Sequence, residues 1–143
     1  MDIDKLKFRV WDDKEKFYQE ADADHCVIDY RGRLHCDFWG DGDCYHSAHL
    51  TNKDVDIEPC IGLKDKNSRL IFLGDVLKNG ECLLEVCWSP TLASYMLDDY
   101  MYNEAGEYEG YGNLYTIHAT EIAEMEVVGN IHEGVKNDTC NSN

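Results

Sequence analysis

Short apolar runs separated by turn residues restrict the fold of this chain more than any other feature of its sequence. In the middle of the chain, the run 70–72 is followed by Gly74-Asp75, and the run 76–78 is followed by Asn79-Gly80. Asn and Gly both tolerate a positive φ, so Asn79-Gly80 between two apolar runs predicts a β-hairpin. Short strands joined by tight turns indicate a small barrel or sandwich, and the expected fold class is therefore mainly β.

The N-terminal part of the chain shows the same β pattern. Residues 5–11 alternate polar and apolar side chains, which predicts a strand with one apolar face. A turn at residues 12–14 is expected to follow that strand. Two further strand-like runs, residues 25–30 and 33–39, flank Arg31-Gly32 and predict a second hairpin.

The C-terminal part is less clearly patterned. The apolar residues of 91–101 follow helical spacing, although a strand fits these residues nearly as well. Strands are expected at residues 111–118 and 122–128. Residues 133–143 lack apolar periodicity, so we expect this tail to be frayed.

Acidic residues greatly outnumber basic ones, with 29 Asp and Glu against 13 Lys and Arg and a formal net charge of −16. Neutralising phosphates requires clustered Lys and Arg, so we expect neither direct nucleic-acid binding nor attachment to an anionic membrane surface. No apolar run approaches the roughly 18 residues of a membrane span. The N-terminus also lacks the apolar stretch of a signal peptide, so the expected location is cytoplasmic.

The seven cysteines are expected to be reduced thiols rather than a disulfide framework. Residues 25–49 are rich in Cys and His, the ligand types that zinc prefers, and the best ligand set there is Cys36, Cys44, His46 and His49. This stretch lacks any C-x2-C pair, so the favoured interpretation is buried cysteines and exposed histidines. We therefore expect no metal and no cofactor.

Motifs for catalysis are missing from the sequence. No serine lies in a G-x-S-x-G context, and no G-x-x-x-x-G-K-[ST] loop is present. The acidic loop 37–43 resembles a calcium cage in composition, but it lacks the spacing and the final glutamate of an EF-hand. Carboxylate pairs such as Asp98-Asp99 could act as acid and base only if buried. The sequence leans against an enzyme, and no catalytic residue is assigned.

The remaining distinctive segment, residues 98–111, alternates acidic groups with four tyrosines. Tyrosine is enriched at protein interfaces, and neighbouring carboxylates would steer a basic partner toward it. The candidate binding residues are Asp98, Asp99, Tyr100, Tyr102, Glu104 and Tyr108. A solvated loop whose tyrosines cover the barrel is an equally good interpretation.

Three motifs lie near the start, the middle and the end of the chain. They are Leu6-Lys7-Phe8-Arg9-Val10-Trp11-Asp12, then Cys60-Ile61-Gly62-Leu63-Lys64-Asp65-Lys66-Asn67 with Ile71-Phe72-Leu73-Gly74-Asp75-Val76, and finally Glu126-Val127-Val128-Gly129-Asn130-Ile131-His132-Glu133. Together and in this order they resemble the YopX family of bacteriophage and prophage proteins. Cys60 stands where that family often has an aromatic residue. Ser68 replaces a glycine after the asparagine, which predicts a stiffer or differently shaped turn.

The resemblance implies one YopX-like domain over residues 1–135. Its N-terminal β region would occupy residues 1–58 and its SH3-like barrel residues 59–132, with the frayed tail at 133–143. It also implies a phage or prophage origin, and hence the cytosol of a bacterial host, but it carries over no catalytic residue.

We expect an accessory or regulatory protein that binds an unidentified protein partner and self-associates through exposed strand edges. A DNA-mimicking inhibitor is one alternative, because its carboxylates would occupy a nucleic-acid-binding cleft. A metal-dependent enzyme built on residues 25–49 is the other.

Overall fold

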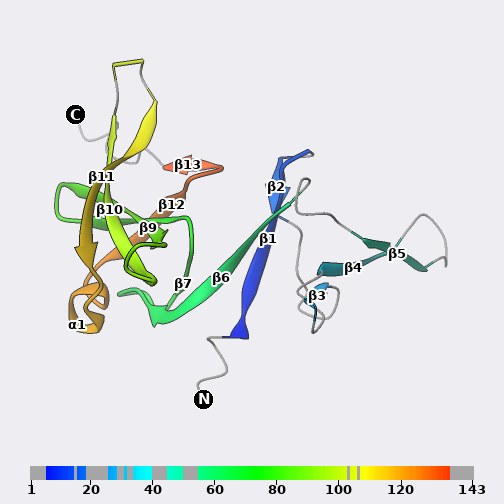
Figure 1. Cartoon of the computed structure of the whole chain (residues 1–143). Coiled ribbons are helices and arrows are strands. Elements are labelled where there is room, and N and C mark those ends of the chain that lie inside the picture. Colours follow the sequence, from blue (N-terminus) through cyan, green and yellow to red (C-terminus); the bar gives the residue numbers. More distant parts are fainter. Residues whose placement is uncertain are drawn as a thin grey trace. The chain divides into compact units, whose positions relative to one another are not determined.

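The computed structural model describes residues 6–14, 16–18, 26–28, 31, 34–39, 45–49, 55–102, 104, 105 and 107–135. Almost all regular structure in these residues is β-strand, in curled sheets (Figure 1). This confirms the mainly β fold class, while the SH3-like detail stays a prediction. The chain divides into two compact units, one at residues 8–58 and the other formed by residues 1–7 and 59–143.

The unit at residues 8–58 opens with an antiparallel hairpin. Its strands are β1 (Phe8–Asp12), β2 (Phe17–Tyr18), β3 (Cys26–Ile28), β4 (Leu34–Trp39), β5 (Tyr45–His49) and the start of β6 (Val55–Lys64). Between β1 and β2, the Asp12 carboxylate accepts a hydrogen bond from the backbone amide of Lys14. Lys16 adopts a left-handed φ of +60° and donates its amide to the Asp12 carbonyl. The turn expected at residues 12–14 is therefore confirmed.

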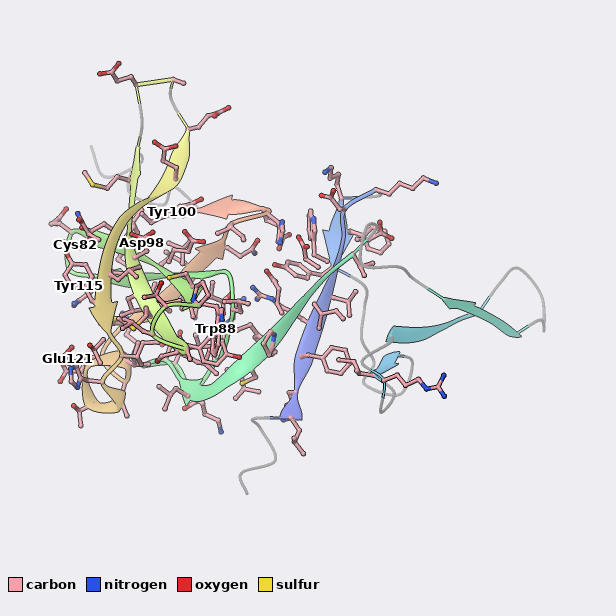
Figure 2. All side chains as sticks on the ribbon, in the orientation of Figure 1. Cys82, Trp88, Asp98, Tyr100, Tyr115 and Glu121 are labelled. Carbon is pink, nitrogen blue, oxygen red and sulfur yellow. The ribbon has the colours of Figure 1, made fainter. Side chains whose placement is uncertain are left out.

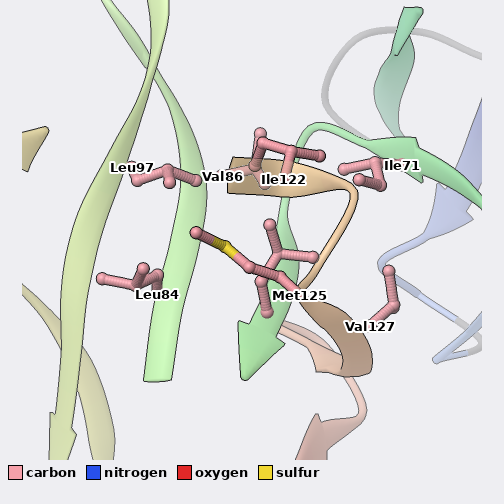
Figure 3. Packing of buried hydrophobic residues seen from close by; sticks show 8 residues of the cluster. Ile71, Leu84, Val86, Leu97, Ile122, Met125 and Val127 are labelled. Atoms are coloured by element: carbon pink, nitrogen blue, oxygen red, sulfur yellow. The ribbon is translucent and has the colours of Figure 1, made fainter. Parts of the chain in front are cut away.

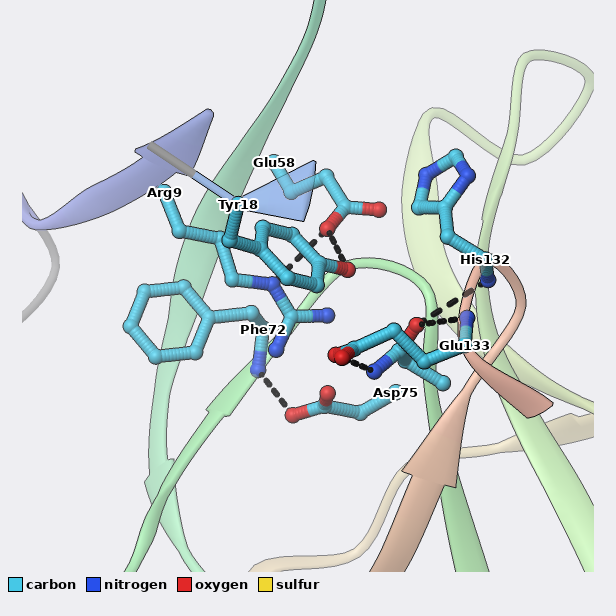
Figure 4. A network of polar contacts seen from close by, with 8 residues as sticks. Arg9, Tyr18, Glu58, Phe72, Asp75, His132 and Glu133 are labelled. Atoms are coloured by element: carbon cyan, nitrogen blue, oxygen red, sulfur yellow. Dashed lines mark hydrogen bonds and ion pairs between the residues drawn. The ribbon is translucent and has the colours of Figure 1, made fainter. Parts of the chain in front are cut away.

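A buried carboxylate ties β6 to this first hairpin (Figure 4). Glu58 is 3% exposed, and its Oε1 accepts hydrogen bonds from Arg9 Nε and from Tyr18 Oη, both at 2.7 Å. The Arg9 guanidinium also lies over the Tyr18 ring, 4.6 Å from its centre, and Trp11 packs edge-on against the same ring. A charged side chain is tolerated inside because a cation and a hydroxyl satisfy it.

Strands β3, β4 and β5 form a three-stranded sheet. β3 pairs antiparallel with β4, with Cys26 opposite Cys36, so the hairpin predicted around Arg31-Gly32 is confirmed. β5 pairs with β4 on its other side and is a strand that the sequence did not predict. Its sequence, Tyr45-His46-Ser47-Ala48-His49, contains no β-branched residue, which is why it gives a weak strand signal.

The second unit is built on a six-stranded antiparallel sheet in the order β11-β10-β9-β8-β12-β13. The strands are β8 (Asp75–Asn79), β9 (Cys82–Ser89), β10 (Ser94–Tyr102), β11 (Tyr108–Thr116), β12 (Glu126–Asn130) and β13 (Gly134–Val135). β7 (Leu70–Phe72) pairs separately with the final residues of β6. Between β11 and β12 the chain forms α1 (Ala119–Ile122).

Two turns predicted from glycine positions are present in this unit. Asn79 pairs with Cys82, which leaves Gly80-Glu81 as a two-residue loop, and Gly80 has a φ of +62°. At the other turn, Gly74 has a φ of +90° and Asp75 Oδ2 accepts a hydrogen bond from the Phe72 amide (Figure 4). Both predictions are confirmed because the turn chemistry is local.

Three expectations for the C-terminal half are corrected or decided. Residues 94–102 form a strand, so the strand alternative for 91–101 holds and the helical one is wrong. Residues 122–125 form the end of α1 and the turn that follows it, so the strand expected from residue 122 starts later, at Glu126. Ile122 and Met125 are buried in the core instead. Residues 134 and 135 pair in β13 and so belong to the sheet instead of a frayed tail. Residues 136–143 lie outside the described part.

Aliphatic side chains from five strands, α1 and the turn after α1 form the core of the second unit (Figure 3). They are Ile71, Leu77, Leu84, Val86, Leu97, Ile122, Met125 and Val127. Ile71, Leu77, Val86 and Ile122 are fully buried, and each stabilises the unit by about 1.5–3 kcal/mol relative to exposure. The short helix thus closes the core that the sheet leaves open.

The turn from Lys64 to Arg69 has an unusual backbone. Ser68 adopts a φ of +63°, the left-handed conformation that costs a non-glycine residue roughly 1–2 kcal/mol. The expected difference from the family's turn stays a prediction. Asp65 compensates by accepting hydrogen bonds from the amides of Asn67 and Arg69, both at 2.9 Å.

No helix in the described part of the chain is long enough and apolar enough to cross a membrane.

Candidate functional site

The β10–β11 hairpin carries the residues that the sequence singles out for binding (Figure 2). β10 lies between β9 and β11, whereas β11 has β10 as its one neighbour among the described strands. The register between β10 and β11 shifts between Asp98 and Tyr100, because β11 has a bulge between Gly110 and Leu114, opposite Asp99. The hairpin extends past the ends of β8 and β9, so its tip is displayed away from the core of its unit (Figure 1).

The structure brings all six predicted binding residues onto this hairpin but does not expose them all. Asp98 is 9% exposed and Tyr100 is 7% exposed, whereas Met101 on the same strand is 48% exposed. Asp99 is half-buried and Glu104 is exposed. Tyr102 and Tyr108 are cross-strand partners near the tip, and their side chains lie outside the described part.

Asp98 faces a second acid, Glu85, across the β9–β10 pair. Asp98 Oδ1 accepts a hydrogen bond from the Gly112 amide at 2.8 Å, which holds the β11 bulge in place. A side chain at Gly110 would start 2.6 Å from Asp98 Oδ2 and 2.8 Å from Glu85 Oε2, so glycine leaves room for both carboxyl groups. Burial, and then the Asp98 charge, raise the pKa of Glu85.

Replacing Glu85 with glutamine is expected to stabilise the second unit by about 0.5–1 kcal/mol at neutral pH, because it removes a like-charge cross-strand pair. The raised pKa of Glu85 means that the folded state holds its proton more tightly than the unfolded state. Wild-type stability therefore falls as pH rises above the ordinary value of 4.5, and the gain from Glu85→Gln is present only there. Urea unfolding at pH values on either side of that range tests this, and an equal gain below pH 4.5 would contradict it.

Asp99 organises a polar cluster on the hairpin that solvent can reach. Its Oδ2 accepts hydrogen bonds from Asn113 Nδ2 at 3.1 Å and from Tyr115 Oη at 3.0 Å. The hydrogen bond to Asp99, and then its charge, raise the pKa of Tyr115. Tyr115 was not among the residues predicted for binding, because it lies 16 positions from Asp99 and meets it through strand pairing alone.

β11 is exposed along almost its whole length. Residues 109, 110 and 112–116 are all exposed, among them Leu114 at 42% and Tyr115 at 47%. On β10, the neighbouring Met101 is 48% exposed. We call Asp99, Met101, Glu104, Glu109, Leu114 and Tyr115 the hairpin surface. It combines apolar contact area with carboxylates. The binding role that the sequence analysis assigns to the acids and tyrosines of residues 98–108 stays a prediction.

A cavity of about 500 Å³ lies elsewhere in the second unit, beside β12 and β13. Its lining includes Arg69, Glu126, Asn130 and Glu133. Glu126 pairs with Lys66 at 3.1 Å, and Asn130 donates a hydrogen bond to Glu133 at 3.0 Å. Because Glu126, Asn130 and Glu133 already have partners in the fold, we interpret the cavity wall as a structural part of the motif at residues 126–133 and not as a binding site.

Three of the four residues weighed as zinc ligands fall on strands of the three-stranded sheet. Cys36, His46 and His49 lie on β4 and β5, and their side chains are outside the described part, as is Cys44 altogether. Within the described residues, no three His, Cys, Asp or Glu side chains converge as metal ligands would. The absence of a metal and of a cofactor stays a prediction.

The chain was compared with protein families, with curated proteins and with solved structures. A family model described as YopX protein matches residues 7–136. Among solved structures, the chain is similar to the crystal structure of protein EF1440 from Enterococcus faecalis, at 23% sequence identity and a TM-score of 0.44. That similarity covers 89% of this chain and 93% of the other. No curated protein matches the chain.

Proposed function

The chain belongs to the YopX protein family, and from this premise we propose that it acts by binding another protein through the hairpin surface. The phage or prophage origin and the accessory or regulatory role that the resemblance implies are part of this proposal. So is a cytoplasmic location.

The observation that carries the proposal is the composition of the exposed hairpin. Met101, Leu114 and Tyr115 are each more than 40% exposed, and such apolar and aromatic groups supply contact energy in protein interfaces. Residues 91–135 contain no Lys or Arg, so no basic side chain within this stretch neutralises its carboxylates. A surface of this kind favours a partner with a basic, partly apolar face.

Substituting serine at both Leu114 and Tyr115 is expected to weaken partner binding about tenfold or more, because the central apolar contacts are lost. The measurement is quantitative capture of proteins from DNase-treated bacterial host lysate, at low and at high salt. Trp88→Ser is the matched control, since Trp88 is 49% exposed on β9 in the same unit. Equal capture by all three proteins, or no stoichiometric partner, would count against the hairpin surface.

A DNA-mimicking inhibitor is a second candidate, favoured by the nine carboxylates and the lack of Lys and Arg in residues 91–135. Its attraction to a nucleic-acid-binding cleft would be electrostatic and would weaken steeply with salt. The same capture experiment distinguishes the two, because a DNA-binding partner would be lost at high salt and displaced by added DNA. Binding that persists at high salt favours the hairpin surface.

A further inference from the structure

We propose that the partner contributes an extended, Lys- or Arg-bearing segment that joins the six-stranded sheet as an added strand along β11. This inference rests on the proposed function and specifies how the hairpin surface binds. It is a β-strand addition, in which backbone hydrogen bonds give affinity and side chains on alternate faces give specificity.

The position of β11 at the end of the sheet supplies the backbone groups for such binding. In an antiparallel pair, every second residue points its amide and carbonyl away from the partner strand. β11 is nine residues long and pairs with β10 on one side, so a row of these groups lies along its other side. The opposite edge, β13, is two residues long, and shortness protects an edge from further pairing.

Exposure of both faces of β11 indicates that an added strand would bury apolar surface. Leu114 and Tyr115 are adjacent and therefore point to opposite faces of the sheet, yet both are more than 40% exposed. The central strand β10 differs, because Met96, Leu97, Asp98 and Tyr100 are all buried there. A strand beside β11 would cover one apolar group on each face.

Charge selects a basic segment over a second copy of this chain. Natural edge strands often carry Lys, which discourages pairing with another strand. β11 contains no Lys or Arg. It carries exposed Glu109, and exposed Glu107 lies just before it. A second β11 would bring the same carboxylates into the same sheet, where like charges repel. An incoming Lys or Arg would instead meet Glu109 on β11 and Glu107 just before it.

The experiment uses the full chain and a synthetic peptide of alternating Lys and Val that is as long as β11. Peptide binding is measured by fluorescence anisotropy, and its location by backbone amide hydrogen exchange. We expect exchange of alternate amides in residues 112–116 to slow about tenfold or more when peptide is bound, with β13 unchanged. A peptide that carries a Pro-Pro pair at its centre and another toward each end should protect little, because two adjacent prolines remove one amide facing β11 whichever residues of the peptide face it. Combining Glu107→Lys with Glu109→Lys should weaken binding about tenfold or more.

Three outcomes would overturn the inference. Binding without protection of β11 would show that side chains alone are contacted, which leaves the proposed function standing. Protection that appears without peptide and grows with protein concentration would identify a second copy as the occupant. Absence of peptide binding would also reject strand addition. The lysate capture with Leu114 and Tyr115 substituted tests the proposed function independently, so the two failures are distinguishable.

Discussion

Replacing Gly129 with alanine is expected to lower the free energy of unfolding of the second unit by about 3 kcal/mol, near the upper end for overpacking. The added Cβ would meet the carbonyl oxygen of Gly134 and would lie 2.8 Å from the Cα of Val135. Both neighbours are backbone atoms of β13, which pairs directly with Gly129. Backbone cannot rotate aside as a flexible side chain can, so β13 must separate from β12.

Gly80→Ala is the matched control for this prediction. At Gly80 a new Cβ meets nothing within 4 Å, but the φ of +62° strains any L-residue by roughly 1–2 kcal/mol. Both variants add one methyl group. At Gly129 the methyl group lacks space, and at Gly80 it has space but is strained by the positive φ. Urea unfolding followed by circular dichroism should show the larger loss for Gly129→Ala. A smaller loss than for Gly80→Ala would mean that β13 contributes little.

Local turn chemistry explains which parts of the fold could be predicted from the sequence. Asn79-Gly80 and Gly74-Asp75 set their turns with residues only a few positions apart, and both turns are present. The turn after Asp12 was predictable for the same reason. Such signals need no knowledge of the rest of the chain.

Features set by strands distant in sequence could not be predicted in the same way. The strand at residues 94–102 has buried runs instead of strict alternation, because it is covered by β9 and β11, and its apolar spacing imitates a helix. The helix at Ala119–Ile122 is too short to show a period, and tertiary packing of Ile122 determines it.

The candidate site shows the same division. Composition draws attention to residues 98–108, since acids and tyrosines alternate there, and the binding role of these residues stays a prediction. The burial of Asp98 and Tyr100 could not be predicted from composition, because it depends on what packs against the faces of the folded sheet. Tyr115 was missed because its contact with Asp99 arises from cross-strand pairing. The signal that could have found it is the apolar pair Leu114-Tyr115 in a predicted strand.

Replacing Asp65 with asparagine is expected to lower the free energy of unfolding by about 3 kcal/mol at neutral pH. Asp65 is 5% exposed, and its Oδ1 accepts hydrogen bonds from the amides of Asn67 and Arg69. Its Oδ2 accepts a third, at 2.9 Å, from the amide of Val127 in β12, 62 positions away. Asparagine keeps one oxygen but turns an amino group toward the third amide, and a buried donor left unsatisfied costs about 1–3 kcal/mol beyond the weakened charged bonds.

The same carboxylate gives this prediction a pH dependence with a definite sign. Burial tends to raise the pKa of Asp65, but the backbone hydrogen bonds from Val127, Arg69 and Asn67, together with the Arg69 charge, hold it below the ordinary value of 3.8. Stabilisation by Asp65 is therefore complete above that value and is lost as pH falls through the lower, folded-state pKa. The difference between wild type and Asp65→Asn should shrink over the same range.

Urea unfolding of both proteins from neutral pH down to about pH 2 measures this difference directly. Glu124→Gln is the matched control, since Glu124 is an exposed carboxylate in the same unit. We expect that control to change stability little, because no buried amide depends on its charge. A wild-type advantage over Asp65→Asn that stays constant into strong acid would show that shape and not charge fixes the turn. An advantage that disappears in acid would show that the Asp65 charge holds the 65–69 turn against β12. These two segments belong to the central and the closing motif that resemble the family.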